Sequence, residues 1–476
     1  MLRRMLGAAC VLASLTADAD GERFMSLRWG GTAAGQPEAF GQLSAALSRY
    51  PSCFDTLCAD KKLDAPSVEA LRKMGVAINQ ADAGLPPPAA FFDDHAPRGM
   101  IGAALLFDPG SPQNGAVLDN RRHCLSGKSA HGLCVESMLY LAFGAERLTY
   151  DLLSYAHEPV AWYANTYMSE LTLWRPFFQA YARYNQGTKP GGILPFCGKG
   201  GKPDLSGTLR AANALAPSGF PVCPGSPWPV CYLLNAESVD SMSAVDIQRV
   251  LSGGVILDGG AAARLQARGF GGAMMMTAQT RPPEVREVFT DDELNLNRVN
   301  YAWQPDATGA DTYAFTPSNE TARVIGRYQT PDGRFAEACS VLTETASGGR
   351  MAAFGFTGFS AEMSAARQRQ VLLAADWVAQ NRLPVFVETA SQVMVIPRVT
   401  LAGDLRSVAV LNASLDVQQP VTLRLRGCLK DIESMDWVTP KDKPVTLPVR
   451  WERKDVLVVL PSIGPWQIGW LRAEGQ

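Results

Sequence analysis

The stretch RLTYDLLSYAHEPVAWY, residues 147–163, decides how the first third of the chain is interpreted. It begins with a short apolar run that ends in an acid, and it then opens into His, Glu, Trp and Tyr. Pro159 is suited to the first turn of a helix, and residues 160–184 continue with the apolar spacing of an amphipathic helix. The stretch therefore predicts a buried strand, a polar turn and a long helix.

Similar units of strand and helix precede this stretch. Helices are predicted at 38–50, 68–79, 98–107, 131–144 and 160–184. The second of these ends in a short strand, VAIN. Strands are predicted at 24–29, 76–79, 115–120 and 147–153. Strands that alternate with helices are joined by crossovers and run parallel, so the pattern predicts an α/β domain with four strands. The segment between the first two helices, residues 51–66, reads as a long irregular connection that is able to cover a sheet edge.

Length and composition limit the classes of protein. A chain of 476 residues exceeds what one core usually supports and implies about three domains. Hydrophobic residues make up 47%, charged residues 19%, and the formal net charge is -2, so nothing favours nucleic acid or an anionic membrane as a partner. The apolar runs all fall short of the ~18 residues needed to span a bilayer. The ten cysteines form no C-x-x-C pair, which indicates small buried hydrophobes instead of a zinc site.

The N-terminal segment has two interpretations. Residues 1–20 contain two arginines, an apolar stretch and small residues, as a short secretory signal does. The same residues also fit a buried amphipathic helix, because DADG supplies a turn and a strand follows at once. We favour the helix and hence a cytoplasmic location; a signal peptide over residues 1–19 would instead imply a secreted or periplasmic protein.

Polar and aromatic side chains gather where the predicted strands end. In a (β/α)₈ barrel the chemistry lies at the carboxyl ends of the strands, so these residues are the candidates for a site. The candidates are Trp29 after the first strand, Gln80 and Asp82 after the second, Asp119, Asn120 and Arg121 after the third, and Asp151, His157, Glu158 and Trp162 after the fourth.

Three segments carry a resemblance to a known family. LTYDLLSYAHEPVAWY followed by WRPFFQAYARYNQGTKPGGI resembles the last strand and helix of the barrel in family 42 (β-galactosidase-like) glycoside hydrolases. LRAANALAPSGFPVCP and the segment CYLLNAESVDSMSAVDIQRVLSGGVILDGGAAARLQARGF are similar to the Rossmann-like, amidotransferase-like domain that follows this barrel. From residue 383 the pattern changes to short alternating runs between turns, which predicts an antiparallel β-sandwich like the family's C-terminal domain.

The resemblance implies three domains. They are a partial (β/α)₈ TIM-type barrel at 1–190, a Rossmann-like or flavodoxin-like α/β domain at 200–380, and a small antiparallel β-sandwich at 383–476. If the strand at 147–153 is the eighth of the barrel, the earlier strands are the seventh, sixth and fifth, and strands one to four are absent. Such a half barrel has bare edges. The chain is then a fragment of a longer product, a partner-dependent half, or a protein that has rebuilt its edge.

The resemblance also implies a reaction. Retaining glycosidases use two carboxyl groups about 5 Å apart, one as nucleophile and one as general acid/base, and in the family both are glutamates after the fourth and seventh strands. The acid/base residue has no matching position in this chain, whereas Asp119 is the only acid near the seventh strand and is our candidate nucleophile. The alternative is that Asp119 caps the following loop or pairs with Arg121 or Arg122, which is an everyday use of an acid beside arginines.

The other candidates also have two interpretations each. His157 and Glu158 are placed to contact sugar hydroxyls, but HEP also reads as a solvated turn. Trp29 and Trp162 can stack on a pyranose ring or simply plug the barrel mouth. Three adjacent residues, Asp93, Asp94 and His95, cannot easily face one ion, so we predict a turn and no metal.

The middle domain supplies no cofactor motif. It lacks G-x-G-x-x-G after its first strand and a G-x-S-x-G elbow, so we predict no cofactor. In the family this domain supports assembly, which makes a homo-oligomer an expectation by analogy.

Three functions remain open at this stage. The first is retaining hydrolysis of β-linked glycosides, β-galactosidase-like, by an incomplete enzyme. The second is a non-catalytic carbohydrate-binding or assembly protein with a degenerate barrel. The third is an amidotransferase-like hydrolase with Cys223 or Cys231 as nucleophile, although all four histidines lie in the first domain.

Overall fold

The computed structural model describes most of the chain in two compact units. One unit lies within residues 1–90, 111–137 and 145–182, and the other within 91–110, 138–144 and 183–476. The described residues are 24–29, 38–59, 63–80, 101, 104–105, 115–119, 128–153, 160–196, 208–224, 229–281, 286–296, 298–303, 311–356, 364–389, 391–428 and 432–473. Within these ranges, the helices are all too short or too polar to cross a bilayer. The N-terminal segment 1–20 lies outside them, as do most of the helix predicted at 98–107 and Asp93, Asp94 and His95.

The first unit contains a five-stranded sheet in which every pair of strands is parallel. The prediction of four strands is therefore wrong by one. The additional strand, β2, forms from TLCA inside the segment 51–66, which we had expected to be irregular. The strands are β1 (Met25–Trp29), β2 (Thr56–Ala59), β3 (Ala77–Gln80), β4 (Gly115–Asp119) and β5 (Arg147–Asp151).

The order of these strands across the sheet is β3-β2-β1-β5-β4. The strands that come first and last in the sequence, β1 and β5, are therefore neighbours. Four consecutive barrel strands would have placed β1 and β5 at opposite edges of the sheet. The prediction that these strands are numbers five to eight of a barrel, with strands one to four absent, is therefore wrong. The steps from β1 to β2, from β2 to β3 and from β4 to β5 all run in one direction across the sheet. Because parallel crossovers are right-handed, such steps place the connecting helices on one face.

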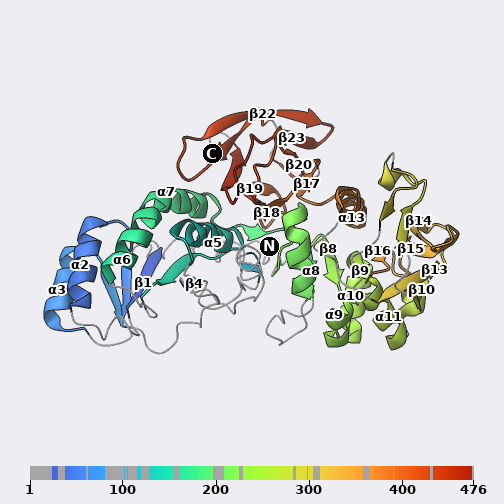
Figure 1. The fold of residues 1–476 in the computed structure, drawn as a ribbon, viewed down its shortest axis with the longest axis horizontal. Coiled ribbons are helices and arrows are strands. Elements are labelled where there is room, and N and C mark those ends of the chain that lie inside the picture. The colour runs from blue at the N-terminus through green and yellow to red at the C-terminus, as the bar shows by residue number, and fades with distance from the viewer. Residues whose placement is uncertain are drawn as a thin grey trace, which may run out of the picture. The chain divides into compact units, whose positions relative to one another are not determined.

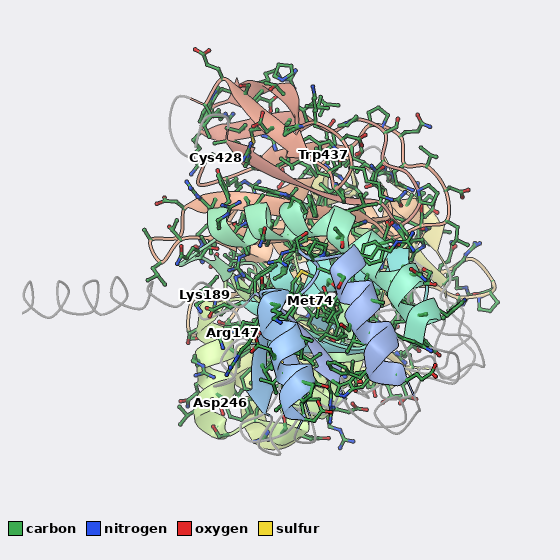
Figure 2. The ribbon with its side chains drawn as sticks, turned by 90° about the vertical axis from the view of Figure 1, so that its left-hand side faces the viewer. Met74, Arg147, Lys189, Asp246, Cys428 and Trp437 are labelled. Atoms are coloured by element: carbon green, nitrogen blue, oxygen red, sulfur yellow. The ribbon has the colours of Figure 1, made fainter. Side chains whose placement is uncertain are left out.

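The helices of this unit begin where the sequence supplies caps and apolar faces. The Asp64 side chain accepts a hydrogen bond from the Ser67 amide at 2.8 Å and starts α3, which has proline in its first turn. Figure 1 shows these helices grouped around the sheet, and Figure 2 labels Met74 at the end of α3. The helices are α2 (Ala39–Arg49), α3 (Ala65–Lys73), α5 (Ala130–Ala142), α6 (Val160–Tyr163), the π-helical turn η2 (Ala164–Met168) and α7 (Ser169–Tyr184).

The second unit begins with a ten-stranded mixed sheet. Its four neighbouring strands β7, β8, β9 and β16 are parallel, and an isolated parallel bridge joins Ile193 to Val222 beyond β7. The remaining strands, from 276 to 344, extend the sheet in antiparallel fashion, a region for which the sequence suggested no elements. The strands are β7 (Ile193–Pro195), β8 (Cys231–Leu234), β9 (Val255–Asp258), β10 (Met276–Arg281), β11 (Arg286–Phe289), β12 (Ala302–Trp303), β13 (Thr312–Pro317), β14 (Arg323–Gln329), β15 (Phe335–Glu344) and β16 (Arg350–Phe354).

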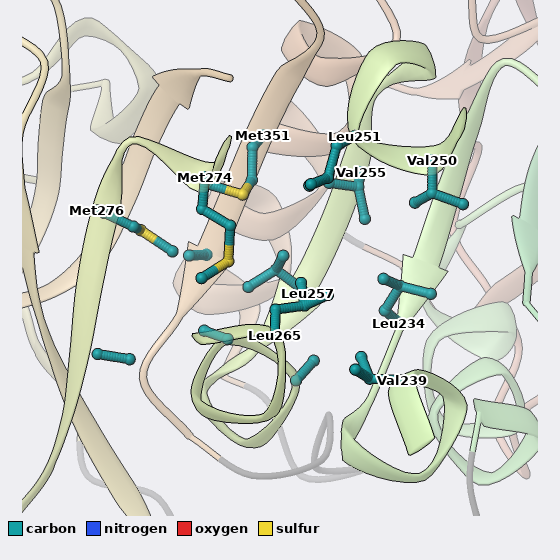
Figure 3. Close-up of a cluster of buried hydrophobic side chains, with 14 of the residues drawn as sticks. Leu234, Val239, Val250, Leu251, Val255, Leu257, Leu265, Met274, Met276 and Met351 are labelled. Atoms are coloured by element: carbon teal, nitrogen blue, oxygen red, sulfur yellow. The ribbon is translucent and has the colours of Figure 1, made fainter. Parts of the chain in front are cut away.

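Side-chain caps start the helices that follow the parallel strands of this sheet. Asn235 and Ser243 each form a capping box, and Asp258 accepts a hydrogen bond from the Ala261 amide at 2.7 Å. These helices pack on the sheet through a core that includes Leu257, Leu265 and Met274 (Figure 3). The helices are α8 (Thr208–Leu215), η3 (Ala216–Ser218), α9 (Ala236–Ser241), α10 (Ala244–Gly253), α11 (Gly259–Leu265), η4 (Gln266–Phe270), α12 (Gly271–Met274), η5 (Glu293–Asn295) and α13 (Ala365–Val378).

The second unit ends in an antiparallel β-sandwich. β22 connects its two halves, because Val445–Pro448 pairs with β21 and Val449–Glu452 pairs with β23. β21 and β24 were not among the predicted strands. The strands are β6 (Lys189–Pro190), β17 (Val385–Val387), β18 (Val393–Val399), β19 (Leu405–Asn412), β20 (Thr422–Leu425), β21 (Ser434–Val438), β22 (Val445–Glu452), β23 (Asp455–Val459) and β24 (Ile468–Ala473).

Candidate functional site

The parallel sheet of the first unit has two faces of different character. Alternate residues of a strand point to opposite faces, so register partners form rows across the sheet. The row through Leu27 is apolar on every strand: Ile78, Leu57, Leu27, Tyr150 and Leu118. This row faces helices, because the Tyr150 hydroxyl lies 2.9 Å from the Ser137 hydroxyl of α5.

The next position on each strand belongs to the opposite face, and four of its five residues are of polar type. We call Asn79, Cys58, Arg28, Asp151 and Asp119, in the order β3-β2-β1-β5-β4, the polar row. It lies at the carboxyl ends of the strands, where parallel α/β sheets place their binding sites. Asp119 and Asp151 are register partners on neighbouring strands, so their backbone positions lie about 4.8 Å apart.

One ion pair crosses the polar row. The Arg28 Nη1 lies 3.4 Å from Asp151 Oδ2, and the side chains are 26% and 2% exposed, respectively. A carboxylate removed from water to this extent needs a partner, and the neighbouring strand β1 supplies one. Asp151 thus combines burial, a cation and an adjacent acidic position.

A second observation marks this face as suited to a polar ligand. Thr56 pairs in register with Ser26. These positions lie two residues before Cys58 and Arg28 and therefore on the same face as the polar row. Its side-chain oxygen is buried and has no hydrogen-bond partner among the described residues. A buried hydroxyl without a partner costs free energy unless another group, such as a ligand hydroxyl, bonds to it.

The two candidate tryptophans lie elsewhere in the first unit. Trp29 belongs to the row on the helix face, where it is buried and packs edge to face on Phe40 of α2 at 6.0 Å. It fills the space between strand and helix and does not join Asp151. Trp162 in α6 is 50% exposed and contacts Tyr163 with ring centroids 4.9 Å apart.

The remaining candidates are only partly described. Gln80 ends β3 and pairs with Ala59, so its position belongs to the row of Trp29 and not to the polar row. Asp82, Asn120, Arg121, His157 and Glu158 lie outside the described residues. The structure therefore pairs the backbone positions of two predicted residues, Asp119 and Asp151, and adds Arg28 as a partner of the Asp151 side chain. Arg28 was not among the predicted site residues, since its pairing with a residue more than a hundred positions away leaves no local signal.

Neither of the two cysteines that the amidotransferase hypothesis names is suited to act as a nucleophile. Cys223 and Cys231 are both fully buried, and burial raises the pKa of both thiols. The Cys223 thiol donates a hydrogen bond to the Gly191 carbonyl at 2.9 Å. A reactive cysteine needs an accessible thiolate, so these two serve as small core residues.

Potential metal ligands do not gather in the described part of the chain, where no group of three or more His, Cys, Asp or Glu residues is suited to hold an ion. Asp258 and Asn235, at the carboxyl ends of β9 and β8, use their side chains to cap helices.

Comparison with known proteins shows a shared fold at very low sequence identity. No protein-family model and no curated protein sequence matches the chain. An α-L-fucosidase, isoenzyme 2 from Paenibacillus thiaminolyticus, superposes with a TM-score of 0.56 at 11% identity, over 92% of this chain and 80% of that one. A β-galactosidase from Bacillus circulans sp. alkalophilus gives a TM-score of 0.47 at 11% identity over 88% and 63% of the two chains.

A β-galactosidase from the psychrophilic Marinomonas ef1 gives a TM-score of 0.46 at 9% identity, over 96% of this chain and 64% of that one. The chain thus spans less than two thirds of each β-galactosidase. The match to the fucosidase, with a TM-score above 0.5, shows that this chain shares the fold of a solved glycosidase.

Proposed function

We propose that the chain is a glycoside hydrolase-like protein that cleaves β-linked glycosides, with galactosides as the first candidates, at the polar row. The single observation that carries this proposal is the register pairing of Asp119 with Asp151 at the carboxyl ends of neighbouring strands. The fold shared with an α-L-fucosidase agrees with this chemistry. The choice of a β-linked galactoside comes from the sequence resemblance to family 42 and is the part that the assay below tests.

The topology of the sheet supports a barrel origin for the site. One direction of winding, with the first strand paired to the last, is the cyclic order of a (β/α)₈ barrel. We infer that the sheet is a barrel wall that is continuous through the pairing of β5 with β1 and open between β3 and β4. The face opposite the helices then corresponds to the barrel interior, where the polar row lies.

The spacing of the two acidic positions favours retention of configuration. Carboxyl groups about 5 to 5.5 Å apart serve retaining enzymes, whereas inverting enzymes need about 6.5 to 9.5 Å. Register partners on adjacent strands have backbones about 4.8 Å apart, which suits carboxyl groups at the retaining separation. One carboxylate attacks the anomeric carbon and forms a glycosyl ester, while the other carboxyl group protonates the departing glycosidic oxygen. Water then attacks the anomeric carbon, gives its proton to the second group and releases the first.

The test is hydrolysis of a panel of nitrophenyl glycosides by the full-length chain. We expect slow release of nitrophenol, because the pair consists of aspartates on neighbouring strands and lacks the family's glutamates. Asp119→Asn and Asp151→Asn should each abolish it. Asp240→Asn is the matched control, since this exposed acid makes only a 3.8 Å contact with Arg264. Rapid turnover that survives Asp119→Asn would refute the site.

A second function is favoured by the burial of Asp151. Its side chain is already paired with Arg28, which suits a residue that positions a bound sugar as well as one that reacts with it. A chain that binds galactosides in calorimetry without hydrolysing them would show a carbohydrate-binding protein with a degenerate barrel.

A further inference from the structure

Hydroxyl groups occupy one row of the parallel sheet on three neighbouring strands. Ser26 of β1 pairs in register with Thr56 of β2 on one side and with Thr149 of β5 on the other. Each of these residues lies two positions before a member of the polar row, so their side chains leave the same face of the sheet. We call Thr56, Ser26 and Thr149 the hydroxyl row. It borders the polar row on the amino-terminal side of the strands.

The hydroxyl of Thr56 is a cost to the free chain. Thr56 is 2% exposed, and its Oγ1 has no hydrogen-bond partner among the described residues, whereas Ser26 and Thr149 are half-buried. The buried Thr345 differs, because its hydroxyl donates a hydrogen bond to the Leu251 carbonyl at 2.9 Å. A valine at position 56 would have nearly the same shape and no polar atom to desolvate. Stability alone therefore does not account for a threonine at this position, and a bound ligand would.

The chemistry of the hydroxyl row selects the kind of ligand. Neighbouring strands lie about 4.8 Å apart, and hydrogen bonds between two oxygens are about 2.7 to 2.8 Å long, so one ligand oxygen between two strands can bond to a hydroxyl on each. A side-chain hydroxyl both donates and accepts, whereas a carboxylate only accepts and an ammonium group only donates. The row carries no charge of its own. It therefore matches the hydroxyls of a neutral sugar better than an ionic group.

We propose that the hydroxyl row is a sugar-binding subsite, in which ring hydroxyls of a neutral sugar bond to Thr56, Ser26 and Thr149. The choice of a sugar as ligand rests on the proposed function. The hydroxyl row then holds the part of the sugar that does not react, and a ligand hydroxyl supplies the partner that Thr56 lacks. Specificity for the pattern of ring hydroxyls follows, because a sugar without the matching group would leave the buried oxygen unpaired.

Thr56→Val in the full-length chain should have two opposite effects. Peptides that cover β2 should exchange their amide hydrogens roughly 5- to 100-fold more slowly, because an unsatisfied hydroxyl is gone. Calorimetric affinity for methyl β-galactoside should fall roughly 2- to 10-fold, because one hydrogen bond to the sugar is lost. Ser26→Ala and Thr149→Val should weaken binding by similar factors, and Thr56→Ser should retain the affinity. Thr345→Val is the matched control: it should speed exchange near β15 and leave the affinity unchanged.

The outcomes separate the subsite from the hydrolase. A Thr56→Val chain that exchanges more slowly but binds the galactoside as the wild type does would overturn the subsite, and so would a wild-type chain that binds no sugar of the panel. Hydrolysis whose KM is the same in Thr56→Val and Thr149→Val would refute the subsite alone. Binding that depends on the hydroxyl row in a chain without turnover would refute the hydrolase and keep the subsite.

Discussion

A bidentate ion pair attaches the β-sandwich to α13 and yields a quantitative prediction. Arg426, directly after β20, places Nη1 2.6 Å from Asp376 Oδ1 and Nη2 2.9 Å from Asp376 Oδ2. The two side chains are only 12% and 9% exposed. Burial raises the pKa of Asp376, although the hydrogen bonds from Arg426 act in the opposite direction. The carboxylate is therefore costly to keep charged and depends on Arg426.

Arg426→Met retains the aliphatic stem and removes the guanidinium. Asp455, the second acidic partner of Arg426 at 3.3 Å, keeps Arg424 at 3.5 Å. Asp376 is left as a buried charge without its partner Arg426, which costs about 3 to 5 kcal/mol. At about 1.4 kcal/mol per factor of ten, the equilibrium constant for local opening of this region should rise by roughly 10²- to 10³·⁵-fold. The raised pKa sets the pH dependence of the loss. As the pH falls, Asp376 takes up a proton and the penalty shrinks, so the effect should be largest near neutrality.

Native-state hydrogen exchange followed by mass spectrometry measures this loss locally in a multidomain chain. Peptides that cover β20 and α13 should exchange faster by the stated factor in Arg426→Met. Adding Asp376→Leu should recover most of the protection, since apolar residues replace buried pairs at little cost. Arg450→Met is the control, because Arg450 is 75% exposed and its pair with Glu452 at 2.8 Å is worth less than about 1 kcal/mol. Equal effects of Arg426→Met and Arg450→Met would refute the reasoning.

Two further predictions concern the sandwich. Burial acts to raise the pKa of Glu388, but hydrogen bonds from Arg424 and Arg369 outweigh it and the pKa is lowered. The stabilisation is thus present near pH 7 and is lost as the pH falls through the lowered pKa, and Glu388→Gln should flatten this dependence in urea titrations. At Gly469 an added Cβ would lie 2.5 Å from the Trp437 ring (labelled in Figure 2) and 2.8 Å from the Val438 carbonyl, so Gly469→Ala should cost about 1 to 3 kcal/mol in thermal unfolding. Gly41→Ala in α2, with nothing within 4 Å, should not destabilise the chain.

Much of the first unit could be predicted because its elements carry local patterns. The strands at 24–29, 115–120 and 147–153 are apolar runs that end at polar residues, and the structure confirms them as β1, β4 and β5. β2 was missed because TLCA is only four residues long and buried at every position. Its residues therefore do not alternate between apolar and polar, which is the pattern by which a half-buried strand is recognised in a sequence.

Only part of the candidate site could be predicted, because only part of it lies at the ends of strands that the sequence reveals. Asp119 and Asp151 were identified individually, because each ends a recognisable strand. Arg28 was not among the candidates, because the undetected strand β2 and the assumption of consecutive barrel strands placed β1 far from β5. Register and strand order depend on contacts between distant segments, which a single sequence does not display.

The pairing of β1 with β5 also sets an order of events during synthesis. Met25 pairs with Leu148, so the ribosome must add 123 further residues before the partner exists. At about 5 to 20 residues per second, this takes roughly 6 to 25 s. During that interval β1 has only β2 to pair with, and its other edge is open to chaperones or to neighbouring nascent chains. Arg28 can contact Asp151 only after β5 has been synthesised, so the ion pair of the site is among the last contacts of its sheet to form.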